Sequence, residues 1–86
     1  MSKQRILVTQ IVEIEVDDAK FTPEFLAEFR KSFYQFDDIS DHRKHLGQLF
    51  ARGIICGFGD EFIEGYGAAK DFGIFCREIS YEVEEP

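Results

Sequence analysis

Apolar and polar residues alternate at both ends of the chain. In residues 5–17, RILVTQIVEIEVD, apolar side chains fall on one face and polar side chains on the other. The apolar face holds Ile6, Val8, Val12, Ile14 and Val16, and the polar face holds Arg5, Thr9, Glu13, Glu15 and Asp17. From residue 75 onward, one face holds Phe75, Ile79, Tyr81 and Val83, and the other holds Glu78, Ser80, Glu82 and Glu84. Because a period of two is typical of a half-buried strand, the sequence predicts a long strand at each end.

The apolar spacing between these two strands is that of helices. Thr22 and Pro23 have the residue types of an N-cap and a first helical position, so a helix is expected to begin there. Its expected core-facing side chains are Phe25, Leu26, Phe29 and Phe33. A second helix is predicted to begin after Ser40 as N-cap and to end before Gly53 in the left-handed conformation. Its expected core-facing side chains are Leu46, Leu49 and Phe50, together with His42.

The segment from residue 57 to residue 73, GFGDEFIEGYGAAKDFG, holds five of the chain's seven glycines. It lacks the third glycine of a dinucleotide loop and the GK[ST] ending of a P-loop, so the motif for phosphate binding is incomplete. Three acidic side chains would also repel phosphate, namely Asp60, Glu61 and Glu64. The same three acids lack the alternating pattern of a calcium loop.

The glycines of this segment therefore predict turns. Gly57 and Gly59 are expected to form one turn, and Gly65 and Gly67 to adopt positive φ angles. Ala68 to Asp71 are expected to form a helical turn before the last strand. The side chains expected to fold back onto the core are Phe58, Phe62, Ile63, Tyr66 and Phe72.

The elements occur in the order strand, helix, helix, glycine-rich connection, strand. A two-stranded ribbon is only marginally stable alone, so the helices are expected to cover its apolar face. Residues 54–64, including a short strand over residues 54–56, or a second copy of the chain could add strands. The sequence predicts an α+β fold, a two-layer β-α-α-(β)-β arrangement in a single domain over residues 1–86. Its antiparallel sheet is expected to be covered on one face by two helices.

Candidate catalytic and metal-binding residues are few. His42 and His45 are three residues apart on a predicted helix and would need Asp38 or Asp41 to complete a metal site. One buried and one solvated histidine is the simpler interpretation. The cysteines at positions 56 and 76 lack CxxC spacing, so both are expected to be reduced and packed as small hydrophobic side chains. We therefore expect no enzyme, no cofactor and no metal site.

The formal net charge of −7 is large for 86 residues. It argues against nonspecific binding to nucleic acid or to an anionic membrane, because phosphate groups would repel the chain. No apolar run has the length of a membrane-spanning helix, and the first residues lack the pattern of a signal peptide. We expect a cytoplasmic protein that meets a partner with a basic surface.

Candidate partner-binding residues lie in two places. The two predicted strands contribute Glu13, Glu15, Asp17, Glu78, Glu82 and Glu84. The glycine-rich segment contributes Asp60, Glu61, Glu64 and Tyr66. If the strands pair, their carboxylates face one another, which is destabilising by roughly 0.2–1 kcal/mol per pair. A chain that keeps several such pairs is a candidate for using them, and the alternative is that they provide solubility and edge protection.

The run FTPEFLAEFRKSFYQFDDISDHRKHLGQLFARGI, followed by FIEGYGAAKDFGI, resembles a family of small uncharacterised proteins encoded by phages and prophages. The resemblance covers roughly residues 12 to 74 and rests on an F-T-P-E-F helix, a helix ending in L-x-A-R-G and an E-G-Y-G segment. It implies a mobile-element setting but no catalytic residue. Small acidic phage proteins often bind a host protein, as anti-CRISPR and anti-restriction proteins do, some of them by mimicking DNA.

Two functions remain open from the sequence. The first is a phage-type interaction protein that binds and inhibits a host defence or nucleic-acid-binding protein, with DNA mimicry as one mode. The second is a small homodimeric ligand-binding or accessory domain with an aromatic pocket.

Overall fold

The computed structural model describes residues 2–85 of the chain. Its strands are β1 (Leu7–Glu15), β2 (Phe62–Ile63), β3 (Gly67–Ala68) and β4 (Phe75–Glu84). Its helices are α1 (Pro23–Ser32) and α2 (Ile39–Ala51), with 3₁₀ turns η1 (Asp18–Lys20) and η2 (Ala69–Phe72). The structure confirms the predicted α+β fold with antiparallel pairing of the two long strands.

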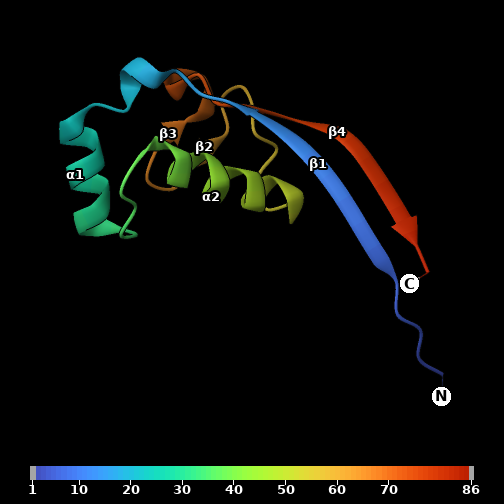
Figure 1. The fold of residues 1–86 in the computed structure, drawn as a ribbon. Helices are drawn as coiled ribbons and strands as arrows, with labels where there is room; N and C mark the ends of the chain where they lie inside the picture. Colours follow the sequence, from blue (N-terminus) through green and yellow to red (C-terminus); the bar gives the residue numbers. More distant parts are fainter. Residues whose placement is uncertain (1, 86) are drawn as a thin grey trace.

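The molecule has a helical body and a projecting ribbon. Figure 1 shows α1, α2 and the small β2–β3 hairpin at one end, with β1 and β4 extending away from them. The radius of gyration is 15.4 Å, against about 12 Å for a compact domain of this length. The overall extents are 51 × 25 × 20 Å. The ribbon is therefore the feature that makes the molecule elongated.

Both helices were expected to cover the ribbon. In the structure, α2 is the helix that packs on it. Gly47 of α2 lies against Val12 and Ile14, where a β-carbon would stand 3.6–3.7 Å from their side chains. In Figure 1, α1 lies on the far side of the body from the ribbon. The two strand pairs also form separate sheets, β1–β4 and β2–β3, in place of one larger sheet.

The helix ends are set by local capping groups. Thr22 Oγ1 accepts a hydrogen bond from Phe25 N at 3.1 Å, which confirms the predicted start of α1. The predicted N-cap of α2, Ser40, is wrong, because Asp38 takes this role by accepting from Asp41 N at 3.1 Å. Aspartate caps a helix as well as serine does, so the helix can begin two residues earlier.

The C-terminal end of α2 closes in a Schellman motif. Gly53 has a φ of 74°, which confirms its predicted left-handed conformation. Its N–H donates to Phe50 O at 3.0 Å, and Ile54 N–H donates to Leu49 O at 2.9 Å. These two bonds satisfy carbonyl groups that the last turn would otherwise leave free.

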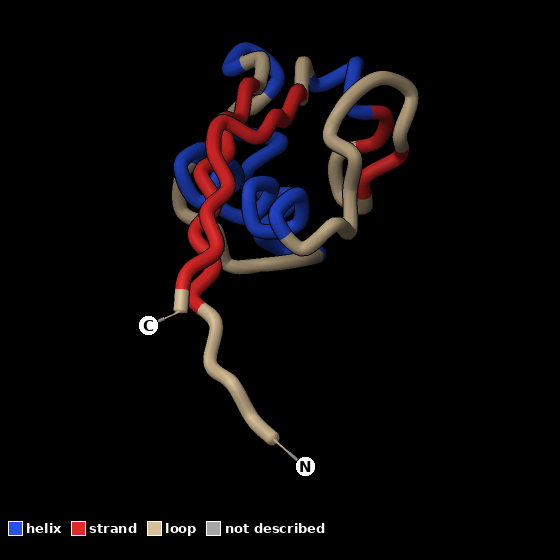
Figure 2. The backbone as a smooth tube through the Cα atoms, turned by 90° about the vertical axis from the view of Figure 1, so that its right-hand side faces the viewer, coloured by secondary structure: helices blue, strands red, loops and turns tan. Residues whose placement is uncertain are grey.

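A β-bulge divides the ribbon into a proximal and a distal half. Val12 lies opposite Glu78 and Ile11 lies opposite Ser80, so Ile79 is an extra residue in β4. The proximal half comprises residues 12–15 and 75–78, next to the body, and the distal half comprises residues 7–10 and 81–84. Figure 2 shows the two strands twisting around each other along this length.

The bulge changes which residues of β4 share a face. Directly opposed residues of an antiparallel pair lie on the same face. The near face, which α2 covers in part, holds Val8, Gln10, Val12 and Ile14 with Val83, Tyr81, Glu78 and Cys76. The outer face holds Leu7, Thr9, Ile11, Glu13 and Glu15 with Glu84, Glu82, Ser80, Arg77 and Phe75. The predicted grouping of Phe75 with Tyr81 and Val83 is therefore wrong, because it assumed an uninterrupted alternation.

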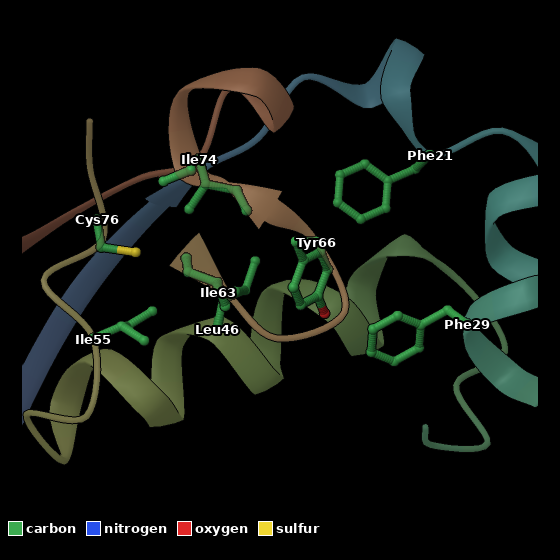
Figure 3. Packing of buried hydrophobic residues seen from close by; sticks show 9 residues of the cluster. Phe21, Phe29, Leu46, Ile55, Ile63, Tyr66, Ile74 and Cys76 are labelled. Carbon is green, nitrogen blue, oxygen red and sulfur yellow. The ribbon is translucent and has the colours of Figure 1, made fainter. Parts of the chain in front are cut away.

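The hydrophobic core lies in the body, between α1, α2 and the glycine-rich segment. Figure 3 shows its buried side chains, which are Phe21, Phe29, Leu46, Ile55, Ile63, Tyr66, Ala69, Ile74 and Cys76. The predicted burial of Ile63 and Tyr66 is confirmed, and Phe72 packs against the same cluster. The predicted burial of Phe58 and Phe62 is wrong, since they are 57% and 75% exposed.

The five glycines of the segment 57–73 all have positive φ angles, which confirms the prediction made for Gly65 and Gly67. Gly57 has a second reason to lack a side chain, because a β-carbon there would stand 2.5 Å from Cys76 Cβ. The helical turn expected over residues 68–71 is η2. Residues 54–56 do not form a strand, and β2 provides the additional strand within residues 54–64. Across residues 2–85, no helix is long and apolar enough to cross a membrane.

Candidate functional site

The outer face of the ribbon carries four of the predicted partner-binding carboxylates. Glu13 and Glu15 belong to the proximal half, and Glu82 and Glu84 belong to the distal half. Glu82 lies opposite Thr9, four residues from Glu13 along β1. At about 3.4 Å per residue the two pairs are about 14 Å apart. The acidic field thus consists of two separate pairs.

The two pairs differ in how far they are neutralised. Arg77 Nε lies 2.9 Å from Glu13 Oε1, so one proximal carboxylate has a cationic partner. Within residues 2–85, the structure shows no ion pair for Glu15, Glu82 or Glu84. The distal pair therefore keeps its full negative charge.

Apolar side chains lie between and beside these acids. Leu7, Ile11 and Phe75 on the outer face are 49%, 55% and 45% exposed. Exposed aliphatic and aromatic groups flanked by charges are typical of protein-binding surfaces. The outer face is consequently a mixed acidic and apolar surface.

Two predicted acidic residues of the strand regions lie elsewhere. Glu78 is on the near face, where it accepts a hydrogen bond from Gln10 Nε2 at 3.0 Å. Asp17 follows β1, and its carboxylate accepts from Ala19 N at 3.1 Å as the N-cap of η1. The bulge places Glu78 on the near face, and the capping role of Asp17 holds its carboxylate at the start of η1.

The acidic residues of the glycine-rich segment have mainly local partners. Asp60 lies 2.6 Å from Lys70 Nζ, in an exposed ion pair. Glu61 accepts from Gly57 N at 2.7 Å and from Cys56 N at 2.9 and 3.0 Å. These bonds hold the turn over residues 56–61 closed. Glu61 is therefore a structural residue, in contrast to its predicted role in partner binding.

Tyr66 is a core residue as well, although it was predicted to contact a partner. It is 4% exposed, and its hydroxyl oxygen lies 2.8 Å from Nδ1 of His42. His42 is 0% exposed, and within residues 2–85 its Nε2 has no hydrogen-bond partner. Sequence reasoning missed this pair because its members are 24 residues apart. The only local signal is that His42 falls on the apolar face of α2.

The environment of this pair favours neutral side chains. Burial lowers the pKa of His42 below its usual value of 6.5, and the positive charge of nearby His45 lowers it further. Asp41 and Asp38 act in the opposite direction, but with smaller effects. Burial raises the pKa of Tyr66. Both side chains are sealed from solvent, so this pair belongs to the core of the body.

A cleft beside α2 is a concave feature of the body. Its volume is about 480 Å³, and Phe33, Tyr34, His45, Leu49, Ile54 and Glu64 contribute to its lining. His45 is half-buried, with its ring 5.1 Å from that of Tyr34, and burial lowers its pKa. The lining combines aromatic and aliphatic side chains with Ser32 and two carboxylates, so it suits a ligand with both apolar and polar groups. Glu61 and Glu64 are the two predicted partner-binding residues that border this cleft.

The cysteines and histidines do not form a metal centre with the nearby acids. Among residues 2–85 there is no group of three or more His, Cys, Asp and Glu side chains that could hold a metal ion. Cys76 is buried, and burial together with the carboxylate of Glu61 raises its pKa to about 11. Cys56 is exposed, which contradicts its predicted packing in the core. Both cysteines are free thiols.

Comparison with known proteins gives no relative. No family model, no curated protein and no solved structure matches this chain.

Proposed function

We propose that this protein is a non-enzymatic, phage-type interaction protein whose ribbon binds a basic surface on a host protein. The observation that carries the proposal is the outer face of the ribbon, which projects from the body and exposes carboxylates beside apolar side chains. A basic partner would gain ion pairs with the acids and would bury Leu7, Ile11 and Phe75. The net charge of −7 would speed such an encounter.

The proposed partner is a defence or nucleic-acid-binding protein in the cytoplasm of the host cell, and binding would inhibit it. Proteins that bind nucleic acid carry basic surfaces that match the acidic outer face. DNA mimicry is the most specific version of the proposal, because carboxylates would then occupy phosphate positions. Within each pair the two carboxylates are on alternate residues of one strand, about 6.8 Å apart, which is about twice the spacing of phosphates along one DNA strand.

Charge reversal at the distal pair tests the proposal. The wild-type protein would be used to capture partners from a bacterial lysate, and the affinity of the purified partner would then be measured. Glu82→Lys combined with Glu84→Lys is expected to weaken binding strongly, because both carboxylates are exposed and unpaired. Glu24→Lys combined with Glu28→Lys on exposed positions of α1 makes the same change in net charge and serves as the control. Equal affinities for the two double variants would contradict the proposal.

Competition separates DNA mimicry from other modes of inhibition. If the acids replace phosphates, DNA and this protein should exclude each other from the partner. Simultaneous binding of both would remove the mimicry version and leave the protein–protein interaction intact.

The cleft favours a second candidate function, a homodimeric ligand-binding domain. A volume of about 480 Å³ is within the range of small-molecule pockets, and its aromatic lining matches the second function expected from the sequence. A screen of small aromatic and aliphatic ligands by thermal unfolding tests it, since a ligand of the native state raises the Tm. Substitution of Leu49 by Lys should abolish the shift of any ligand that occupies the cleft.

A further inference from the structure

Strand β1 has an edge that the chain itself does not use. Within residues 2–85, the backbone groups of β1 bond to β4 and to no other segment. The opposite edge of β4 is partly occupied, because Cys76 N donates to Gly57 O at 2.8 Å. The open edge of the ribbon is thus the free side of β1.

The first part of this edge, over residues 7–12, lacks the usual protection against pairing, whereas Glu13 and Glu15 charge the remainder. Edge strands commonly carry charged residues, proline or a covering segment, which prevent association with another strand. Leu7 to Val12 contain no charge and no proline, and Leu7, Val8 and Ile11 are about half exposed. β4 carries three carboxylates, at Glu78, Glu82 and Glu84, which would repel a second copy of β4. β1 is therefore the strand suited to self-pairing.

The near face of the ribbon is also only half covered. Gly47 of α2 contacts Val12 and Ile14 in the proximal half. In the distal half of the same face, Val8, Tyr81 and Val83 are 51%, 57% and 56% exposed. A two-stranded ribbon without a second layer is marginally stable, so this half gains most from added strands.

We propose that β1 pairs with β1 of a second copy of this chain, antiparallel and in the register that places Gln10 opposite Gln10. The product is a four-stranded sheet in the order β4–β1–β1–β4. Val8 then lies opposite Val12 of the second copy, and Ile6 lies opposite its Ile14. Aliphatic residues meet aliphatic residues along the near face on both sides of the two-fold axis.

Charge supports the same register. Arg5 lies opposite Glu15 of the second copy, and symmetry produces this pair twice. Within residues 2–85, neither Arg5 nor Glu15 has an ion pair inside its own chain. A shift to Thr9 on the axis would place Arg5 opposite Glu13, which Arg77 already neutralises, and Val8 opposite Gln10. The register with Gln10 on the axis therefore gives both Arg5 and Glu15 an ion-pair partner and keeps Val8 opposite an aliphatic side chain.

The two α2 helices are kept apart along the ribbon in this arrangement. A two-fold axis perpendicular to the sheet keeps both near faces, and so both α2 helices, on the same side. Residue 13 of one copy lies opposite residue 7 of the other, so the two helices are offset by six residues, or about 20 Å. A helix with its side chains is about 10–12 Å wide, which leaves room for both.

The dimer does not depend on the proposed function. β4 forms the outer strand on each side of the sheet, so Glu82 and Glu84 stay exposed in both copies. Measuring self-association of the purified protein tests the dimer, and capture from a lysate tests the host partner. Either result can be positive while the other is negative.

Charge exchange across the axis tests the pairing and its register. Sedimentation equilibrium would measure the dissociation constant of the wild-type protein and of three variants. Arg5→Glu and Glu15→Arg should each weaken the dimer about tenfold, because each change places like charges opposite each other twice. The double variant should restore wild-type affinity. Both positions are exposed, so far-ultraviolet circular dichroism is expected to show unchanged folding.

Cross-linking provides an independent measurement. In a Cys56→Ser background, Gln10→Cys should form an intermolecular disulfide under mild oxidation, because directly opposed Cα atoms are about 4.5–5.5 Å apart. Tyr81→Cys, which lies beside Gln10 on β4, is the matched control and should not cross-link. The proposal is overturned by a wild-type monomer throughout the micromolar range, by a double variant that stays as weak as the single ones, or by cross-linking at position 81 in preference to position 10.

Discussion

The body and the distal half of the ribbon use similar residues in opposite ways. Leu46 and Tyr66 in the body are 0% and 4% exposed, whereas Leu7 and Tyr81 in the ribbon are 49% and 57% exposed. In the body, α1, α2 and the glycine-rich segment converge on one cluster. Among residues 2–85, the distal half of the ribbon is a single layer that extends away from the helices (Figure 1). The comparison shows that the topology alone decides which apolar residues stabilise the fold and which are available to another molecule.

The largest expected difference comes from a matched pair of leucine truncations. Leu46→Ala should lower the free energy of unfolding by about 2–5 kcal/mol, because it leaves a cavity in the core. Leu7→Ala should change it by less than about 0.5 kcal/mol in dilute protein, because the side chain is already half exposed. Urea denaturation measures both. Similar losses for the two variants would mean that the distal ribbon is packed in the isolated chain.

A matched pair of tyrosine substitutions sharpens the comparison. Tyr66→Phe removes the hydroxyl that bonds to His42 and leaves a buried imidazole nitrogen without a partner. The expected loss is about 1–3 kcal/mol. Tyr81→Phe on the ribbon removes an exposed hydroxyl and should leave stability unchanged. The same denaturation measurement applies, and a neutral Tyr66→Phe would show that the bond to His42 is not stabilising.

Acidification should destabilise the body through its histidines. The native pKa of His42 lies below 6.5, so the unfolded chain binds a proton first as the pH falls. Stability is then fully present above about pH 6.5 and decreases toward the native pKa, by at most about 1.4 kcal/mol per pH unit for each histidine. His45 acts in the same direction. Titration of the two imidazole resonances by NMR checks the sign, and a native pKa above 6.5 for His42 would contradict it.

The smallest change in the free energy of unfolding is expected for a substitution at Gly47, where α2 contacts β1. Gly47→Ala should raise the free energy of unfolding by about 0.5–1 kcal/mol, because alanine favours helix and its β-carbon would make ordinary contacts with Ile14. Gly57→Ala is the contrasting control, since its β-carbon would overlap Cys76 and its φ is positive. Thermal unfolding measures both shifts. A destabilising Gly47→Ala would indicate that α2 lies closer to β1 than the structure shows.

Features that depend on a few neighbouring residues could be predicted from the sequence. The cap at Thr22 and the left-handed Gly53 each act within one turn of a helix, so their residue types are sufficient evidence. The choice of Asp38 over Ser40 was harder, because two good capping residues compete within three positions. The pattern of β1 also predicted its buried side correctly, since Val12 and Ile14 do face α2.

Features that join distant parts of the chain could not be predicted in the same way. The bond between His42 and Tyr66 needs the glycine-rich segment to fold back across α2. The role of Glu61 depends on a turn that brings two backbone amides to its carboxylate. The acidic surface was predicted in outline, but the bulge at Ile79 moved Glu78 off it. An extra residue in a strand cannot be recognised from the alternation of apolar and polar residues alone. It becomes visible only when the pairing with the neighbouring strand is known.

That bulge has a consequence for how the protein can change. If Ile79 paired regularly opposite Ile11, without a bulge, every later side chain of β4 would lie on the opposite face of the sheet. Glu82 and Glu84 would exchange places with Tyr81 and Val83, while β1, the helices and the core would keep their positions. The pairing of one residue therefore separates two chemically different tips on the same scaffold, and the binding specificity of the tip can diverge without any change to the residues that hold the body together.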